Sequence, residues 1–340
     1  MFTAIFGSVE SGIIYAIMAL GVYLSFRILD FPDLTVDGSF VTGAAVAATL
    51  VVSGVNPFVA TMVSILAGFA AGCITGIIHT FGKINALLSG ILMMIALYSI
   101  NLRIMGKSNV PLLNQETSFT HVESFWAKLG IDSAMESMFT AVGLGEYVPS
   151  TWGILFFMIL VTFLIKFLTD RFLKTEIGLA LRATGDNQRM IRSLSANTNI
   201  LIILGLGISN AMVALSGALI AQYSGFADVG MGIGMIIIGL ASVIIGEALF
   251  GTKTIVRTTL AVIGGAIIYR IVVSMALRVE FLETGDMKLI TATIVILALI
   301  LPKVMDRYKE KKRKAAKQAQ RLQELALSPK GKDDSSVTIK

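Results

Sequence analysis

Long apolar runs dominate the chain and recur from residue 12 to residue 305. A run of about 18 or more apolar residues predicts a helix that crosses a lipid bilayer. A transmembrane barrel would instead show short alternating strands, so an all-α fold is favoured. We expect an all-α polytopic membrane protein with about nine transmembrane helices, at residues 12–28, 38–55, 58–81, 86–105, 152–168, 200–223, 233–250, 258–277 and 289–305.

The composition excludes a water-soluble domain. Apolar residues make up 55% of the chain and charged residues 15%, and the mean hydropathy is +0.80. A soluble surface of this size needs more charge. Cys73 is the only cysteine, so no internal disulfide can form. His79 and His121 are far apart in sequence, and we expect no metal site.

The charges in the connections predict the direction of the chain. Lysine and arginine gather in segments 166–199 and 303–340, which should therefore be cytoplasmic. Segment 106–151 carries more acids than bases and should be external. The N-terminus is then outside and the C-terminus cytoplasmic. The first 40 residues decide the N-terminal side, because one additional half-helix there would reverse it.

The chain divides into a transmembrane domain, 1–305, and a basic cytoplasmic tail, 306–340. The first part of the tail can form a basic helix on the anionic inner leaflet, which makes membrane lipid a partner. Its end, after Ser328, is polar and predicted to be disordered. We expect no nucleic-acid binding.

Segment 171–199 is too polar to span the membrane, although it has a helical pattern. Thr175 is a plausible N-cap and Gly185 a plausible C-terminal cap. Asp186 or Asn187 can start a second short helix that leads into the next span. Two short helices bent at this corner would make a compact knob able to receive force from a soluble motor. The alternative is an ordinary basic loop that only sets topology.

The stretch IGLALRATGDNQRMIRSLSANTN, within this segment, resembles the coupling-helix segment of the ribose and branched-chain amino-acid class of ABC importer permeases. That family has a Gly-x-x-x-x-Ala-x-Gly-x-Asn core. Ala196 and Asn197 depart from the Gly-Ile that usually follows. Segments 11–26, 32–48, 83–97 and 244–253 resemble other parts of the family in the same order. The residues that match the core and the element after it are Gly178, Ala183, Gly185, Asn187 and Ser195.

The resemblance implies partners for this chain. Two copies of an ATPase subunit would use ATP and Mg, and an extracellular substrate-binding lipoprotein would deliver the solute. A second permease copy would complete the pathway, and this chain itself would bind no cofactor. The residues expected to couple to the ATPase are Glu176, Gly178, Leu181, Arg182, Ala183, Gly185, Asp186, Asn187 and Arg189.

The chain is not expected to hydrolyse ATP itself. Its nearest approach to a phosphate-binding loop is GEALFGTKT, residues 246–254. A P-loop requires lysine directly after the second glycine, and here Thr252 intervenes. The motor is therefore expected to be another polypeptide.

Polar residues within the membrane are candidates for the solute path. The candidates are Asp37, Ser39, Asn101, Ser209, Asn210 and Gln222. The alternative for each is a hydrogen bond between helices. Asp33 and Asp37 lie four residues apart, and a capping role before the second span is the alternative to a gate. Charges should stay near span ends or in turns, as expected for Glu10, Asp33, Asp37, Glu247 and Arg270.

The segment DLTVDGSF, residues 33–40, resembles family members paired with lipoproteins thought to carry aromatic amino acids. The expected function is therefore import of a small polar solute, an amino acid and possibly an aromatic one, across the cytoplasmic membrane of a bacterium. Three alternatives stay open at this point. They are an ion-coupled secondary transporter, an ABC importer for a sugar or nucleoside, and a membrane scaffold without transport.

Overall fold

The computed structural model describes residues 2–130, 151–194 and 196–276, with isolated positions at 132, 140, 289, 292–293, 296–297 and 300. The chain divides into two compact units, Met1–Val295 and Ile296–Lys340, and the helices and strands named here all belong to the first. The predicted basic tail and all but a few positions of the predicted ninth span lie outside the described residues.

The described elements are almost all helical. The first helix, α1, continues directly as a π-helical turn, η1. In chain order the elements are α1 (Phe2–Tyr23), η1 (Leu24–Ile28), α2 (Thr35–Val52), α3 (Pro57–Thr80), α4 (Ala86–Met105), β1 (Asn109–Pro111), α5 (Ser118–Lys128), α7 (Gly153–Phe172), α8 (Glu176–Ser193), α9 (Thr198–Ser224), β2 (Phe226–Asp228), α10 (Met235–Phe250) and α11 (Ile255–Ala276).

The all-α class and the several membrane spans are confirmed. Seven helices of the described residues are long and apolar enough to cross a membrane, and α10, with 16 residues, is a shorter apolar helix. These eight coincide with eight of the nine predicted spans, so the count of nine stays a prediction. The predicted span 152–168 extends as α7 to Phe172, and its last turns contain a buried ion pair of Lys166 with Asp170, with 2.5 Å between Nζ and Oδ2.

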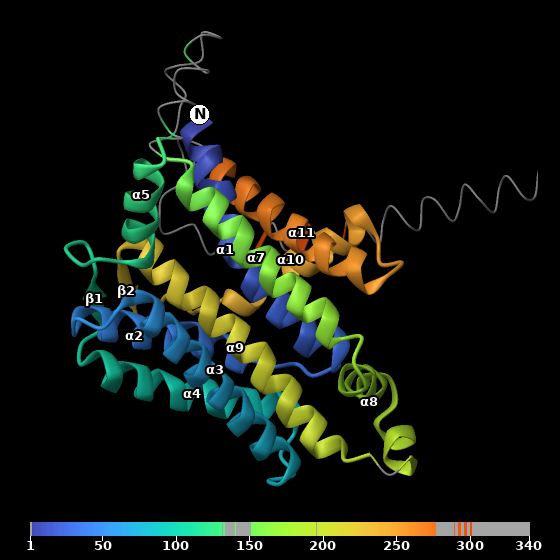
Figure 1. Cartoon of the computed structure of the whole chain (residues 1–340). Coiled ribbons are helices and arrows are strands. Elements are labelled where there is room, and N and C mark those ends of the chain that lie inside the picture. The colour runs from blue at the N-terminus through green and yellow to red at the C-terminus, as the bar shows by residue number, and fades with distance from the viewer. Residues whose placement is uncertain are drawn as a thin grey trace, which may run out of the picture. The chain divides into compact units, whose positions relative to one another are not determined.

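Helices α1 and α9 form the centre of the bundle (Figure 1). Helix α9 packs on α1, α2 and α3, while α1 also packs on α7, α10 and α11. Glycines let the backbones approach closely, as in other membrane bundles. A Cβ atom on Gly43 of α2 would lie 1.9 Å from the carbonyl oxygen of Ala214 in α9. One on Gly217 of α9 would lie 2.0 Å from the carbonyl oxygen of Phe40.

The two ends of the bundle carry different connections, with α5 at one end and α8 at the other (Figure 1). At the α5 end, β1 and β2 pair antiparallel, with Val110 opposite Ala227. Strand β1 belongs to segment 106–151, which we predicted to be external, and β2 follows α9. At the α8 end, Arg27 of η1 forms an ion pair with Glu247 of α10. The structure thus places α5, in segment 106–151, and α8 at opposite ends of the bundle, and the assignment of the α8 end to the cytoplasm stays a prediction.

Candidate functional site

Helix α8 forms the predicted knob, with a bend inside it. Thr175 is the N-cap, because its Oγ1 accepts a hydrogen bond from the Gly178 backbone N–H at 3.2 Å. The helix breaks at Asn187, which has φ −157° and ψ 88°. Asn187 Oδ1 accepts a hydrogen bond from the Met190 backbone N–H at 3.1 Å, and so it caps the helical part of α8 that follows the break. The predicted N-cap and the corner are therefore confirmed.

Gly185 has a different role from the predicted one. It lies within the first part of α8 and is not a C-terminal cap. A Cβ atom on Gly185 would lie 2.1 Å from the Ile28 carbonyl oxygen at the end of η1. The glycine therefore lets α8 rest on the backbone at the end of the first membrane helix. Gly178 makes a similar contact, 2.1 Å from the Phe172 carbonyl oxygen to its notional Cβ.

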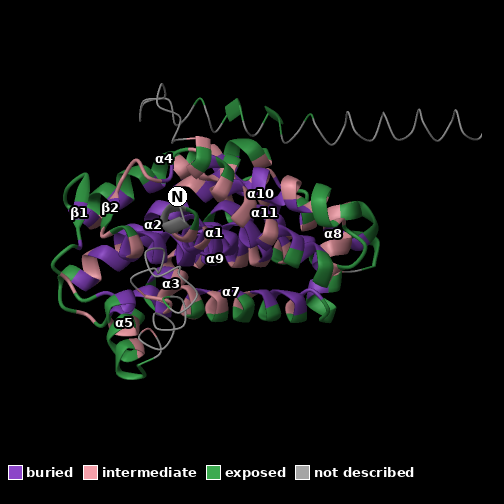
Figure 2. Ribbon diagram, turned by 90° about the horizontal axis from the view of Figure 1, so that it is seen from above, coloured by how far each residue is buried: buried purple, intermediate pink, exposed green. Residues whose placement is uncertain are grey.

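The other face of α8 is turned to solvent (Figure 2). Of the predicted coupling residues, Leu181 is fully buried, while Arg182 and Ala183 are partly buried. The exposed ones are Glu176, Asp186, Asn187 and Arg189. Large apolar side chains are exposed beside them, namely Ile177, Leu179, Met190 and Leu194. An apolar surface with charges around it is typical of a protein interface. Ser195 lies outside the described residues.

A second polar region lies inside the bundle, where the chain between η1 and α2 enters it. Asp33 in this connection is fully buried, and its Oδ2 accepts from Asn210 Nδ2 at 2.6 Å. Asn210 lies near the middle of α9. Asp33 Oδ1 also accepts from the Thr35 backbone N–H at 2.9 Å, at the start of α2. Burial raises the pKa of Asp33 above its ordinary value, and the hydrogen bonds from Thr35 and Asn210 oppose that rise.

Asp37 joins α2 to the start of α10. Its Oδ2 accepts from the Gly234 backbone N–H at 2.9 Å, and its Oδ1 accepts from that of Ile236 at 2.8 Å. The negative carboxylate thus meets the positive end of the α10 dipole. The backbone just before α2 and just before α10 is not helical. Carboxylates of the protein accept hydrogen bonds from the N–H groups at these helix starts. Such interrupted helices, with their backbone groups satisfied inside the protein, are typical of transporters.

The remaining candidate path residues are also buried, and three of them connect helices. Ser209 Oγ donates to the Gly21 carbonyl oxygen at 2.7 Å. Gln222 Nε2 donates to Thr61 Oγ1 at 2.9 Å, and its Oε1 accepts from the Ser118 backbone N–H at the same distance. Asn101 Nδ2 donates to the Gly38 carbonyl oxygen at 3.2 Å. Ser39 Oγ and Asn101 Oδ1 have no hydrogen-bond partner among the described residues.

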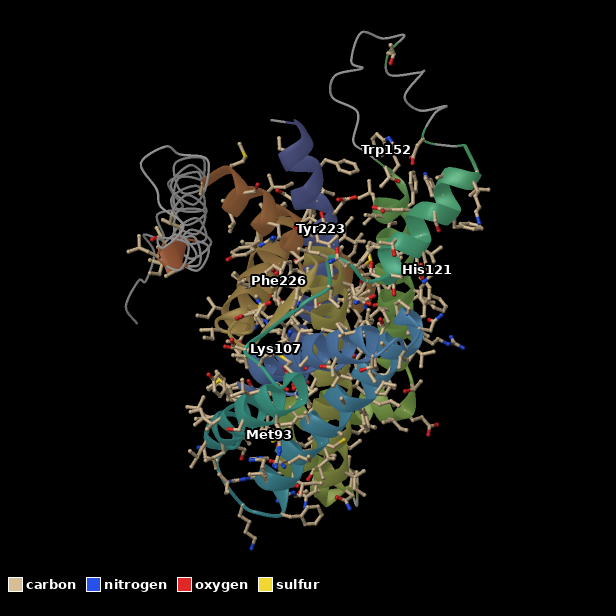
Figure 3. All side chains as sticks on the ribbon, turned by 90° about the vertical axis from the view of Figure 1, so that its left-hand side faces the viewer. Met93, Lys107, His121, Trp152, Tyr223 and Phe226 are labelled. Carbon is tan, nitrogen blue, oxygen red and sulfur yellow. The ribbon has the colours of Figure 1, made fainter. Side chains whose placement is uncertain are left out.

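A third polar cluster, near the α5 end, was not predicted. Glu10 is 6% exposed inside α1, and its Oε2 accepts from Tyr223 Oη at 2.9 Å. Tyr223 lies beside the N-terminal helix in Figure 3. Arg270 Nε donates to Ser11 Oγ at 3.3 Å, and its guanidinium carbon is 4.6 Å from the centre of the Tyr15 ring. The signal was present in the sequence, because charged residues within apolar runs are costly unless they have a function or a partner. We had started the first span after Glu10, and the helix begins at Phe2.

No group of three or more His, Cys, Asp or Glu side chains in the described part of the chain is placed to hold a metal ion. A bundle of apolar helices with interrupted backbone inside it is typical of a membrane transport protein.

The comparisons identify the family. The family model described as the branched-chain amino acid transport system / permease component matches residues 4–301. The chain therefore belongs to this family. It is the permease subunit of an ABC importer, a multi-pass protein of the bacterial cytoplasmic membrane. The resemblance inferred from the coupling segment is thus confirmed at the level of the family.

Three relatives extend this result. The tyrosine transport system permease protein of Clostridioides difficile (strain R20291) is 45% identical over 294 residues, covering 86% of this chain and 90% of the relative. Uncharacterized protein RP368 of Rickettsia prowazekii (strain Madrid E) is 31% identical over 86% of this chain and 95% of its own. The ribose import permease protein RbsC of Escherichia coli (strain K12) is 24% identical over 87% of this chain and 84% of the relative. No solved structure matches the chain.

Proposed function

We propose that this permease moves an amino acid, with an aromatic amino acid as the first candidate, into the cell. The relative with 45% identity is named for tyrosine transport, and the one named for ribose import is 24% identical. The segment at residues 33–40, which carries Asp33 and Asp37, supports the same assignment.

The proposed assembly contains two permease copies, two ATPase subunits and an extracellular binding lipoprotein. Each ATPase would dock on the solvent face of α8, through Glu176, Asp186, Asn187 and Arg189 together with the exposed apolar side chains there. Arg182 and Ala183 border that face. In this proposal residues 1–305 form the membrane domain, and residues 306–340 form a basic tail at the inner leaflet.

The observation that carries the coupling proposal is the contact of α8 with the ends of η1 and α7 and with α9. Gly185 touches the end of η1, Gly178 touches the end of α7, and Leu181 packs beside Gly205 of α9. A rigid displacement of α8 would therefore move η1 and α7 directly. Asp170 of α7 accepts a hydrogen bond from Thr259 Oγ1 of α11 at 2.7 Å, which would carry the movement on to α11. Such a movement can change which side of the membrane the path faces.

The solute path would run beside α2, where four of the six candidates lie on or against that helix or the connection before it. Asp37 and Ser39 are on α2, Asn101 bonds to its backbone, and Asn210 bonds to Asp33. Because Asp37 holds the start of α10 by two hydrogen bonds, movement of α10 would expose this carboxylate. Ser209 and Gln222 lie on α9, at the contacts with α1 and α3.

Transport assays with purified components test the proposal. Proteoliposomes that contain the permease, its ATPase and the lipoprotein should accumulate labelled tyrosine only with ATP, and should not accumulate ribose. Uptake that needs no ATPase would instead support an ion-coupled transporter, and uptake of ribose in place of tyrosine would overturn the solute class.

A double variant and a control test the docking face. The double variant, Arg189→Glu with Leu179→Glu in one chain, should reduce co-purification of the ATPase at least about ten-fold, because buried unpaired charge disrupts an interface. Lys83→Glu is the matched control, because Lys83 is an exposed cation in the α3–α4 turn. Equal co-purification of the two variants would contradict the assignment of α8 as the coupling helix.

A further inference from the structure

A cavity of about 590 Å³ opens beside α8, at the end of the bundle where η1, α8 and the α10–α11 turn meet. Its lining includes Arg27, Arg182, Lys253 and Glu247, together with the hydroxyl side chains of Tyr23 and Thr258. The volume is within the range of small-molecule sites, which is about 300–1,000 Å³. The cavity is therefore large enough to hold a polar group of a ligand.

The charges of this cavity favour an anion. Both oxygens of the Glu247 carboxylate accept hydrogen bonds from Arg27, with Nε to Oε1 at 3.0 Å and Nε to Oε2 at 3.1 Å. The single acid is thus matched by Arg27. Among the described residues, neither Arg182 nor Lys253 forms an ion pair. The cations of Arg182 and Lys253 are therefore left to attract an anion. Arg182 lies on α8 and Lys253 in the α10–α11 turn.

An apolar groove of about 510 Å³ lies on a neighbouring face of α11. It is formed by α1, α7 and α11, with side chains such as Ile13, Ile159, Phe163 and Leu260. Phe250 and Arg257 line the groove at the α10–α11 turn, and Arg257 directly precedes Thr258 of the cavity. On α11 the groove extends from Arg257 to Ile267, about 15 Å at the helical rise. That length equals half of a ~30 Å hydrocarbon core, the depth of one leaflet.

We propose that an anionic phospholipid of the inner leaflet binds here, with its headgroup phosphate between Arg182 and Lys253 and one acyl chain in the groove of α1, α7 and α11. Charge complementarity selects the phosphate, and the apolar groove beside it selects a lipid over a free anion. The lipid would bridge the coupling helix and the α10–α11 turn, so its presence would change how firmly α8 is held. This inference goes beyond solute transport and does not depend on the identity of the solute.

Binding is measured on the full-length permease in mild detergent, by titrating lipid and following the thermal unfolding midpoint. Phosphatidylglycerol should raise the midpoint at lower concentration than phosphatidylcholine with the same acyl chains. Inorganic phosphate at matched ionic strength should not raise it. An equal effect of the two lipids would overturn the proposal. An effect of inorganic phosphate as large as that of the lipid would assign the cavity to a soluble phosphate compound and would overturn the lipid assignment.

The headgroup half of the site is tested with Lys253→Gln. Loss of one cation near the membrane surface is worth about 1 kcal/mol, so the apparent affinity for phosphatidylglycerol should fall roughly five-fold. Lys83→Gln removes an exposed cation in the α3–α4 turn, outside the cavity, and should leave the affinity unchanged. An equal fall in both variants would show only a general surface charge effect and would contradict the site.

The acyl-chain half is tested with Leu260→Trp, which fills the groove from a position that is 49% exposed. Leu164→Trp is the control, because Leu164 is 53% exposed on α7 and lines neither the cavity nor the groove. Only the groove variant should weaken binding of phosphatidylglycerol. Unchanged binding by Leu260→Trp would overturn the acyl-chain assignment. None of these measurements involves the ATPase, so their failure would leave the proposed transport function standing.

Discussion

Helices α8 and α9 follow one another in the chain, yet they are held in opposite ways. Helix α9 is buried over most of its 27 residues, and Ser209, Asn210 and Ser216 bond to α1 and to Asp33. Half of the residues of α8 are exposed, and the helix is held on one face through residues that include Gly178, Leu181 and Gly185 (Figure 2). The difference shows that α9 is fixed in the bundle along most of its length, whereas α8 rests against the bundle on one face only.

Among the variants that test this comparison, Gly43→Ala should lower the stability of the permease most. Its Cβ would lie 1.9 Å from the Ala214 carbonyl oxygen, so α2 and α9 must separate. Overpacking of a tight contact costs typically about 1–3 kcal/mol, and we expect the upper end because the obstacle is backbone. The thermal unfolding midpoint of the purified permease should fall clearly. Gly7→Ala is the control, since its nearest neighbour is Tyr223 Oη at 3.8 Å, and an equal fall there would refute the reason given.

Gly185→Ala should act on transport more than on folding. The added Cβ would lie 2.1 Å from the Ile28 carbonyl oxygen and would push α8 off the end of η1. We expect ATP-dependent uptake to fall roughly ten-fold, equivalent to about 1.4 kcal/mol, with a smaller change in the unfolding midpoint than for Gly43→Ala. Ser193→Ala, exposed at the end of the same helix, should retain uptake. If Gly185→Ala unfolds as readily as Gly43→Ala, the contrast between α8 and α9 is wrong.

Asp33→Asn tests the polar centre of the bundle through pH. Burial raises the pKa of Asp33 in the folded protein, so the folded state binds more protons than the unfolded state. This contribution to stability is complete below the unfolded pKa of about 3.9 and is lost as pH rises through the folded pKa. The unfolding midpoint of the wild type should therefore decline as pH rises above about 4, and the variant should not show this decline. Asp186→Asn, exposed on α8, should keep the wild-type slope.

Thr61→Val should have the smallest effect. Thr61 Oγ1 accepts from Gln222 Nε2, which also donates to the Ala218 carbonyl oxygen at 3.2 Å. Because the amide keeps a partner, the loss should be about 1 kcal/mol, measured by chemical unfolding of the purified permease. Thr42→Val removes a bond within α2 only and should change stability by less. A loss of several kcal/mol for Thr61→Val would mean that this hydrogen bond supports the bundle as strongly as the close contact of Gly43 with Ala214 does.

The local signals of the sequence were sufficient for the helices and for the knob. Apolar length predicted eight helices that the structure contains, because in a bilayer a backbone must satisfy its own hydrogen bonds. Thr175 and Asn187 were found because caps depend on neighbouring residues alone. Helix α5 was missed, although Thr117 and Thr120 form a reciprocal capping box at its start. The signal was short and lay in segment 106–151, for which we had predicted only an external position.

The sequence by itself determined an all-α membrane fold, the positions of eight spans and the bend of α8, since these follow from hydropathy and local capping, and its resemblance to a family gave the permease class. Only the tertiary structure decided what the special residues do. Gly185 supports a contact with Ile28, which is more than 150 positions away in the chain. Asp33 meets Asn210, and Glu10 meets Tyr223, through helices that are neighbours only after folding. Such pairings depend on how the helices pack, and spacing along the chain carries no information about that.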